Sequence, residues 1–155
     1  MTTLRIKSID INPRTVVEVG RFTILWGAFE NDMCDNKCTN IRLEQIAKRC
    51  SPSIQWQAFA AALKARAAYL DINIDTYVDS YLFLSRARSA VPQKKVKKFI
   101  ASGGNESFSG GFMAIYRIRN NMFHGEKWMK KGGKRLELFI AASNLLEALL
   151  KTGGL

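Results

Sequence analysis

The stretch of sequence that decides the fold is residues 108–125, which read FSGGFMAIYRIRNNMFHG. Its apolar residues recur at intervals of three and four, which is the spacing of one face of an α-helix. These residues are Phe112, Ile115, Ile118 and Met122. We therefore expect a helix that begins between residues 105 and 108 and ends near residue 123. The pair Gly110-Gly111 weakens its first turns, which indicates either a close approach of neighbouring backbone or a frayed start.

The same spacing recurs along most of the chain, and strand-like alternation is limited to residues 4–9. The further helices that we expect are one after Pro13 through Phe29, a short one capped by Thr39 or Asn40, one from Ile54 to about Leu70, one starting at Asp75 or Thr76, a short basic one around Lys94–Lys98 and a last one from Leu136 to Leu149. No repeat or linker divides the sequence. The pattern predicts an all-α fold, an antiparallel bundle of about five main helices in a single domain over residues 1–155.

The charge of the chain is strongly one-sided. It has 24 Lys and Arg against 13 Asp and Glu, a formal net charge of +11. Such an excess attracts polyanions through long-range steering and counterion release. Nucleic acid is the leading partner expected, although the same charge also fits simple solubility. A chain of 155 residues is long enough to bury a core without disulfides or a structural metal.

The three cysteines, Cys34, Cys38 and Cys50, are an odd number, and the start of the chain has no apolar signal segment. These features favour a cytoplasmic location with reduced cysteines. Zinc would need further ligands from distant residues, so no metal is expected. No apolar run approaches the roughly 20 residues that cross a bilayer, so no membrane partner is expected either.

The only histidine of the chain, His124, follows Arg119 by five positions near the end of the predicted helix. Its imidazole can both give and take a proton near neutral pH, while a guanidinium holds a permanent forked charge suited to phosphate oxygens. In a continuous helix the two residues lie roughly 140° apart around the axis. Either the helix ends close to His124, as Gly125 in a capping position suggests, or a second copy of the chain shares the site.

The pattern Arg119-Asn120-x-x-x-His124, with Gly125 behind it late in an all-α chain, resembles the HEPN superfamily, whose motif is Arg, a polar residue, three to five others and His. It is particularly similar to small stand-alone HEPN proteins of prokaryotes and mobile elements. The resemblance implies a metal-independent endoribonuclease without a cofactor, working as a homodimer in which the motifs of two protomers face one cleft. It also implies a toxin or antiviral host-defence effector, with an antitoxin or other regulatory protein as a further partner.

On this resemblance the catalytic residues are Arg119, His124 and Asn120. His124 transfers protons, Arg119 orients the scissile phosphate and stabilises the transition state, and Asn120 bonds the phosphate or holds Arg119 in place. RNA carries its own nucleophile, the 2′-hydroxyl, so the chemistry needs only an acid-base group and positive charge. The products expected are a 2′,3′-cyclic phosphate and a 5′-hydroxyl end.

Further candidates surround the motif. Asn121 and the basic loop after His124 are expected to bind RNA, with a tryptophan for base stacking. These candidates are Asn121, Lys127, Trp128, Lys130 and Lys131. Glu30 and Asn31, at the end of the first predicted helix, either orient Arg119 or are simply the polar end of that helix.

Other interpretations of the motif stay open. His124 can be a helix-end histidine that binds carbonyl groups, with Arg119 and Asn120 as ordinary surface residues. The alternative function is a non-catalytic basic helical module that binds RNA or docks on a partner protein. Replacing His124 distinguishes the two functions, because only cleavage depends on its imidazole.

Overall fold

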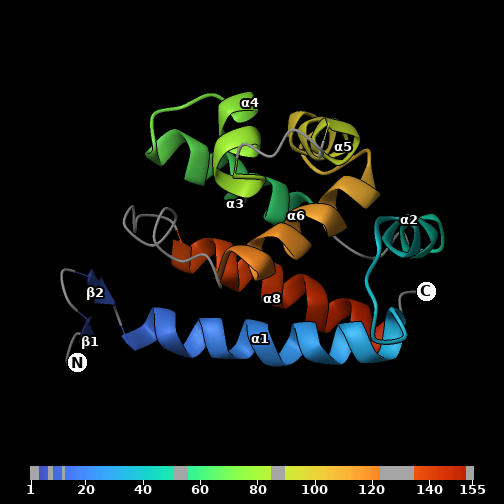
Figure 1. Cartoon of the computed structure of the whole chain (residues 1–155), viewed down its shortest axis with the longest axis horizontal. Coiled ribbons are helices and arrows are strands. Elements are labelled where there is room, and N and C mark those ends of the chain that lie inside the picture. The colour runs from blue at the N-terminus through green and yellow to red at the C-terminus, as the bar shows by residue number, and fades with distance from the viewer. Residues whose placement is uncertain are drawn as a thin grey trace.

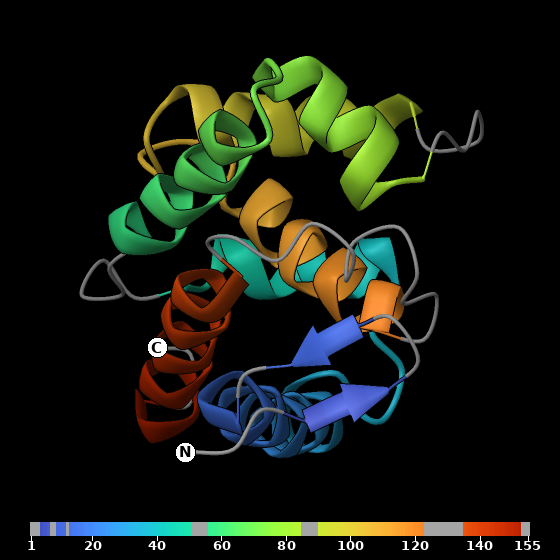
Figure 2. The same cartoon turned by 90° about the vertical axis from the view of Figure 1, so that its left-hand side faces the viewer.

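The computed structural model describes the backbone of residues 4–6 and 9–11 and all atoms of residues 13–50, 56–84, 90–122 and 135–152. Nearly all of these residues are helical, which confirms the all-α prediction. The elements are β1 (Leu4–Ile6), β2 (Ile9–Ile11), α1 (Pro13–Met33), α2 (Asn40–Lys48), α3 (Gln57–Tyr69), α4 (Ile74–Thr76), the π-helix η1 (Tyr77–Leu82), α5 (Ala90–Ala101), α6 (Phe108–Asn121) and α8 (Arg135–Thr152) (Figure 1). The alternation at the start of the chain corresponds to β1 and β2, which pair antiparallel (Figure 2).

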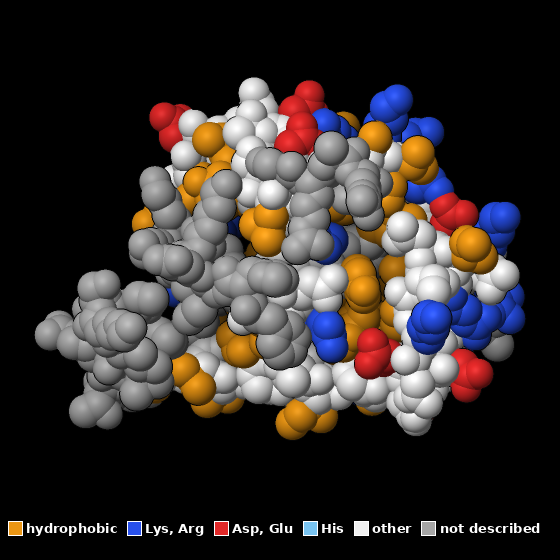
Figure 3. All heavy atoms as spheres, viewed as in Figure 1, with side chains coloured by type: hydrophobic (Ala, Val, Ile, Leu, Met, Phe, Trp, Pro, Cys, Tyr) orange, Lys and Arg blue, Asp and Glu red, His pale blue; other side chains and the backbone are white. Residues whose placement is uncertain are grey.

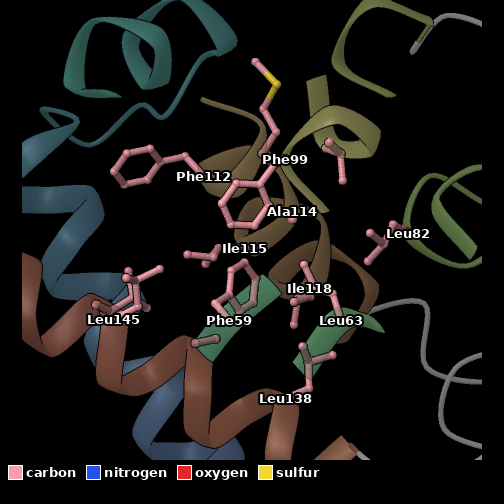
Figure 4. Close-up of a cluster of buried hydrophobic side chains, with 14 of the residues drawn as sticks. Phe59, Leu63, Leu82, Phe99, Phe112, Ala114, Ile115, Ile118, Leu138 and Leu145 are labelled. Carbon is pink, nitrogen blue, oxygen red and sulfur yellow. The ribbon is translucent and has the colours of Figure 1, made fainter. Parts of the chain in front are cut away.

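Helix α6, which carries the motif, runs through the middle of the molecule. It lies between a layer formed by α3, α4 and α5 and a second layer formed by α1 and α8 (Figure 1). Its apolar stripe is buried as the spacing predicts, with Phe112 and Ile115 fully inaccessible to solvent. Around that stripe Figure 4 shows Phe59 of α3 and Leu138 and Leu145 of α8. Side chains of both layers therefore pack against α6, and these contacts fix the position of its C-terminal end.

The two glycines at the start of α6 mark a close approach to neighbouring residues. A Cβ atom at Gly110 would lie 2.1 Å from the backbone oxygen of Lys95 in α5. A Cβ atom at Gly111 would lie 2.6 Å from the indole ring of Trp56. Both positions belong to the regular helix, so the close approach is confirmed and the frayed start is wrong. The missing side chains let α5 and α6 pack backbone against backbone.

The caps of two helices show why they begin where they do. Thr39 caps α2 as predicted, since its Oγ1 accepts a hydrogen bond from the backbone nitrogen of Arg42 at 3.1 Å. The helix expected from Asp75 or Thr76 begins slightly earlier. There Asn73 is the N-cap, and its Oδ1 accepts from the backbone nitrogen of Thr76 at 2.7 Å.

The segment after Thr76 differs from the α-helix expected there. Only Ile74–Thr76 is α-helical, and the chain then widens into η1, a π-helix closed by the backbone nitrogen of Phe83, which donates to the oxygen of Val78 at 2.9 Å. π-Helical turns are rare, and they are frequent at functional sites. Here the widened turn faces the end of α6, as its contacts show below.

The C-terminal end of α6 also differs in detail from the prediction. The α-helix ends at Asn121 and its C-cap is Met122, slightly before the end expected near residue 123. Gly125 itself lies outside the described residues. His124 lies there too, so both arrangements that the motif spacing left open stay predictions.

The cysteines of the loop between α1 and α2 are not reduced as expected. Cys34 and Cys38 form a disulfide, and both are buried. Between them Asp35 and Asn36 adopt left-handed backbone angles, with φ of 52° and 66°, which Asp and Asn tolerate better than most residues. This reversal brings the two Cα atoms to 5.0 Å. The half-buried Cys50 takes no part in the disulfide.

Candidate functional site

Arg119 and Asn120 lie side by side on the last turn of α6, and both are half-buried. Nη1 of Arg119 donates a hydrogen bond to Oδ1 of Asn120 at 3.0 Å. A cation in the last turn also interacts favourably with the negative end of the helix dipole. The guanidinium is thus held at the end of the helix by a neighbour on the same turn.

The last turn of α6 is itself fastened to the end of η1. Nε of Arg117 donates to the backbone oxygen of Leu82 at 2.9 Å, and its guanidinium lies 5.4 Å from the centre of the Phe83 ring. Nδ2 of Asn121 donates to the backbone oxygens of Tyr81 at 2.9 Å and Leu82 at 3.1 Å. Arg117 and Asn121 are one helical turn apart, and Nη2 of Arg117 donates a hydrogen bond to Oδ1 of Asn121 at 3.4 Å. We call this set of contacts the η1 clamp; it fixes the turn that carries Arg119.

Asn121 is therefore a structural residue, and the prediction that it binds RNA is wrong. Its side chain is only 3% exposed, and its amide group is used by carbonyl oxygens of η1. The sequence did not decide between a supporting role and a surface role, because an asparagine beside a motif arginine looks the same whether it faces solvent or a neighbouring element.

Replacing Asn121 with alanine is expected to lower the free energy of unfolding by about 2 kcal/mol, because buried carbonyl oxygens lose their donor. Urea unfolding followed by circular dichroism measures this. The matched control is Asn31→Ala, because Asn31 is exposed and its amide donates to the adjacent Asp32. We expect that control to change stability by less than about 0.5 kcal/mol. Equal stability of the two variants would contradict the η1 clamp.

Two aromatic contacts define how α1 and α6 lie against each other. The rings of Trp26 and Tyr116 are 5.9 Å apart, and those of Phe29 and Phe112 are 5.6 Å apart. The contact residue on α1 thus advances by three positions, from Trp26 to Phe29, while its partner on α6 goes back by four, from Tyr116 to Phe112. The two helices run antiparallel at this contact.

This register separates Glu30 and Asn31 from the motif. Glu30 is next to Phe29 and so lies near the level of Phe112. Arg119 is seven residues further along α6, which corresponds to about 10 Å. Because two helical turns separate them, the structure does not support the predicted role of Glu30 and Asn31 in orienting Arg119.

The remaining candidates lie outside the described residues. They are His124, Lys127, Trp128, Lys130 and Lys131. The structure thus describes the arginine half of the motif, and the roles of these residues stay predictions.

A buried arginine beside the motif turn was not among the candidates. Arg66 of α3 is 2% exposed, and with Tyr77 and Asn121 it lines a cavity of about 20 Å³, which is roughly the space of one water molecule. Burial lowers the pKa of Arg66, Tyr77 opposes this shift, and Arg135 adds a smaller lowering. Burial also raises the pKa of Tyr77. The sequence held one signal, since Arg66 follows Leu63 by three residues on the buried side of α3.

Within the described part of the chain no three His, Cys, Asp or Glu side chains gather as metal ligands do. None of the described helices is long and apolar enough to span a bilayer. No family model, curated protein or solved structure matches the chain. The resemblance to the HEPN superfamily therefore stays a prediction.

Proposed function

We propose that this chain is a metal-independent endoribonuclease of the HEPN type, with Arg119, Asn120 and His124 as its catalytic residues. The observation that carries the proposal is that the side chain of Arg119 is held in a fixed position. Its guanidinium is half-buried, is hydrogen-bonded to Asn120 at 3.0 Å, and stands on a turn held by the η1 clamp. A preorganised cation of this kind stabilises a charge that develops in a transition state better than a mobile surface arginine does.

The end of α6 supports a role for His124 in the same site. The regular helix stops at Asn121, and Met122 is its cap. A helix end at this point is what the first arrangement of Arg119 and His124 requires, because a continuous helix would hold the two residues roughly 140° apart. A homodimer that combines the arginine of one protomer with the histidine of the other belongs to the same proposal.

The reaction follows from the chemistry of RNA. The 2′-hydroxyl oxygen attacks the adjacent phosphorus, so the P–O2′ bond forms and the P–O5′ bond breaks. His124 handles the proton that leaves the 2′-hydroxyl or the one that joins the departing 5′-oxygen. Arg119 binds the phosphate oxygens while negative charge builds on them, and Asn120 keeps the guanidinium aligned. The products are a 2′,3′-cyclic phosphate and a 5′-hydroxyl end, and the scheme needs no metal ion.

The alternative is a non-catalytic module that binds RNA through its basic surface. The observation in its favour is the cluster of cations on α2 and α5, which lies near the opposite end of α6 from Arg119. Binding by such a module does not depend on the imidazole of His124. Digestion of RNA in excess EDTA by the wild-type chain and by His124→Ala separates the two functions. A toxin or defence role, with an antitoxin as partner, is the biological setting that fits the nuclease.

A further inference from the structure

The outer face of α1 is apolar. On its inner side the helix packs on α6 through Trp26 and Phe29, and α8 runs beside it (Figure 1). On its outer side Ile24 is 75% exposed, the highest value among the large hydrophobic side chains of the described residues. We call the outer residues the α1 face, and they are Val16, Val17, Gly20, Thr23, Ile24 and Gly27. Hydrophobic side chains stand out along the lower margin of Figure 3, where α1 runs, and an exposed apolar surface of this kind often marks an interaction site.

The polar groups of this part of α1 are turned away from the α1 face or are used inside the helix. Nη2 of Arg21 donates to Oε2 of Glu147 on α8 at 2.6 Å, and Glu18 pairs with Arg21 at 3.5 Å. Oγ1 of Thr23 donates to the backbone oxygen of Val19 at 2.8 Å. The α1 face is thus uncharged, although the chain carries a net charge of +11. Nucleic acid and anionic lipid both attract cations, so this surface does not suit them.

The ends of α1 carry opposite charges on one side of the helix. Arg14 and Asp32 are both exposed, and about five turns of helix separate them, which places them on the same side. They lie equally far from Thr23 along the sequence. In a second copy that runs antiparallel about a two-fold axis at Thr23, Arg14 of each copy therefore lies opposite Asp32 of the other. A parallel copy would put like charges at the same end, so the charges favour the antiparallel order.

The shape of the α1 face fits the same arrangement. The axis at Thr23 brings Ile24 of each copy beside Gly20 of the other, and Val17 beside Gly27, each within about 3 Å along the helix. Nothing lies within 4 Å of the position that a Cβ atom would take at either glycine. A glycine inside a helix lowers its stability relative to alanine, and packing within the chain does not require these two. They leave room for the two side chains that protrude from the other copy.

We propose that the α1 face binds a second copy of this chain, with the two α1 helices antiparallel about a two-fold axis at Thr23. The contact is apolar along its centre and has an ion pair between Arg14 and Asp32 at each end. The α1 face points away from α6, which packs on the inner side of the helix. This pairing is therefore separate from the cleft of the proposed nuclease and does not depend on it.

The first test measures the mass of the chain in solution by sedimentation velocity over a range of concentrations. Ile24→Glu puts a charge at the centre of the contact in both copies, and we expect it to weaken pairing at least about a hundredfold. The matched control is Ile41→Glu on α2, because Ile41 is 70% exposed and lies outside the α1 face. At concentrations where wild type and the control stay paired, Ile24→Glu should have half their mass.

Gly20→Ala separates a loss of contact from damage to the fold. The added methyl group occupies the space for Ile24 of the other copy, so pairing is expected to weaken about tenfold. The separated protomer should unfold at a higher temperature than wild type in dilute protein, because alanine is the better helix former. The same gain in the separated protomer applies to Gly27→Ala. A variant that only damaged the fold would unfold at a lower temperature.

Reversing the charges tests the antiparallel order. Arg14→Glu and Asp32→Arg are each expected to weaken pairing about tenfold, because each puts like charges at both ends of the contact. The two changes together restore opposite charges and should restore the affinity. A parallel pairing gives no such rescue.

Four results would overturn the inference. They are a wild-type chain that is monomeric at every concentration, Ile24→Glu with the wild-type mass, equal losses in Ile24→Glu and Ile41→Glu, and charge reversals that do not rescue each other. A monomeric wild-type chain that sediments with phosphatidylcholine vesicles would assign the α1 face to lipid instead. The readout is mass, so the result does not depend on whether the chain cleaves RNA.

Discussion

Replacing Arg119 with alanine is expected to lower kcat for RNA cleavage about a thousandfold, with a smaller effect on KM. The guanidinium contacts the phosphate most strongly when charge has built up in the transition state, so its loss appears mainly in kcat. Arg119→Lys keeps the charge but loses the planar fork that pairs with two phosphate oxygens. We expect it to retain only part of the activity.

The control for this experiment is Arg14→Ala, which removes an exposed arginine at the start of α1. Thermal unfolding of both variants checks that the fold survives. Arg119→Ala with the wild-type kcat and an unchanged unfolding temperature would show that Arg119 is an ordinary surface residue, which is the interpretation that the sequence also allows.

The largest effect on stability is expected from Gly110→Ala. The new Cβ atom would meet the backbone oxygen of Lys95 at 2.1 Å, and neither backbone can rotate away as a side chain does. Separating α5 from α6 is expected to cost about 3 kcal/mol. For a chain of this size that lowers the unfolding temperature by about 10 °C, measured by calorimetry or circular dichroism.

The matched control for Gly110 is Gly27→Ala on α1. Gly27 is also helical, but nothing lies within 4 Å of the position that its Cβ atom would take. Alanine is the better helix former, so this variant is expected to gain about 0.5–1 kcal/mol. A Gly110→Ala protein as stable as Gly27→Ala would contradict the packing of α5 against α6.

The sequence predicted those parts of the fold that depend on a single residue or on the spacing of apolar residues. The apolar stripe of α6 and the Thr39 cap are of this kind, and both were predictable. The π-helix was not. Its carbonyl oxygens at Tyr81 and Leu82 bond to Asn121 and Arg117, about 40 residues away in sequence. An apolar pattern carries no information about such distant partners.

In the candidate site, too, only the contacts between residues close in sequence could be predicted. The Arg119-Asn120 pair is a neighbouring pair in sequence, so its contact needs no knowledge of the fold. The structure does not support the roles considered for Glu30 and Asn121, and the sequence could not decide them because they depend on which residue of one element lies opposite which residue of another. The disulfide between Cys34 and Cys38 was not predicted for a related reason. The left-handed backbone of the residues between them decides whether the two cysteines meet, and their spacing alone does not show it.

The measurement that tests the central claim most directly is digestion of total RNA in excess EDTA by the wild-type chain and by His124→Ala, followed by analysis of the new ends. We predict cleavage by the wild type alone, with 2′,3′-cyclic phosphate and 5′-hydroxyl ends. Equal cleavage by both proteins, or products with 5′-phosphate ends, would contradict a metal-independent ribonuclease centred on Arg119 and His124. RNA that both proteins bind and neither cuts would contradict it as well and would favour the binding module.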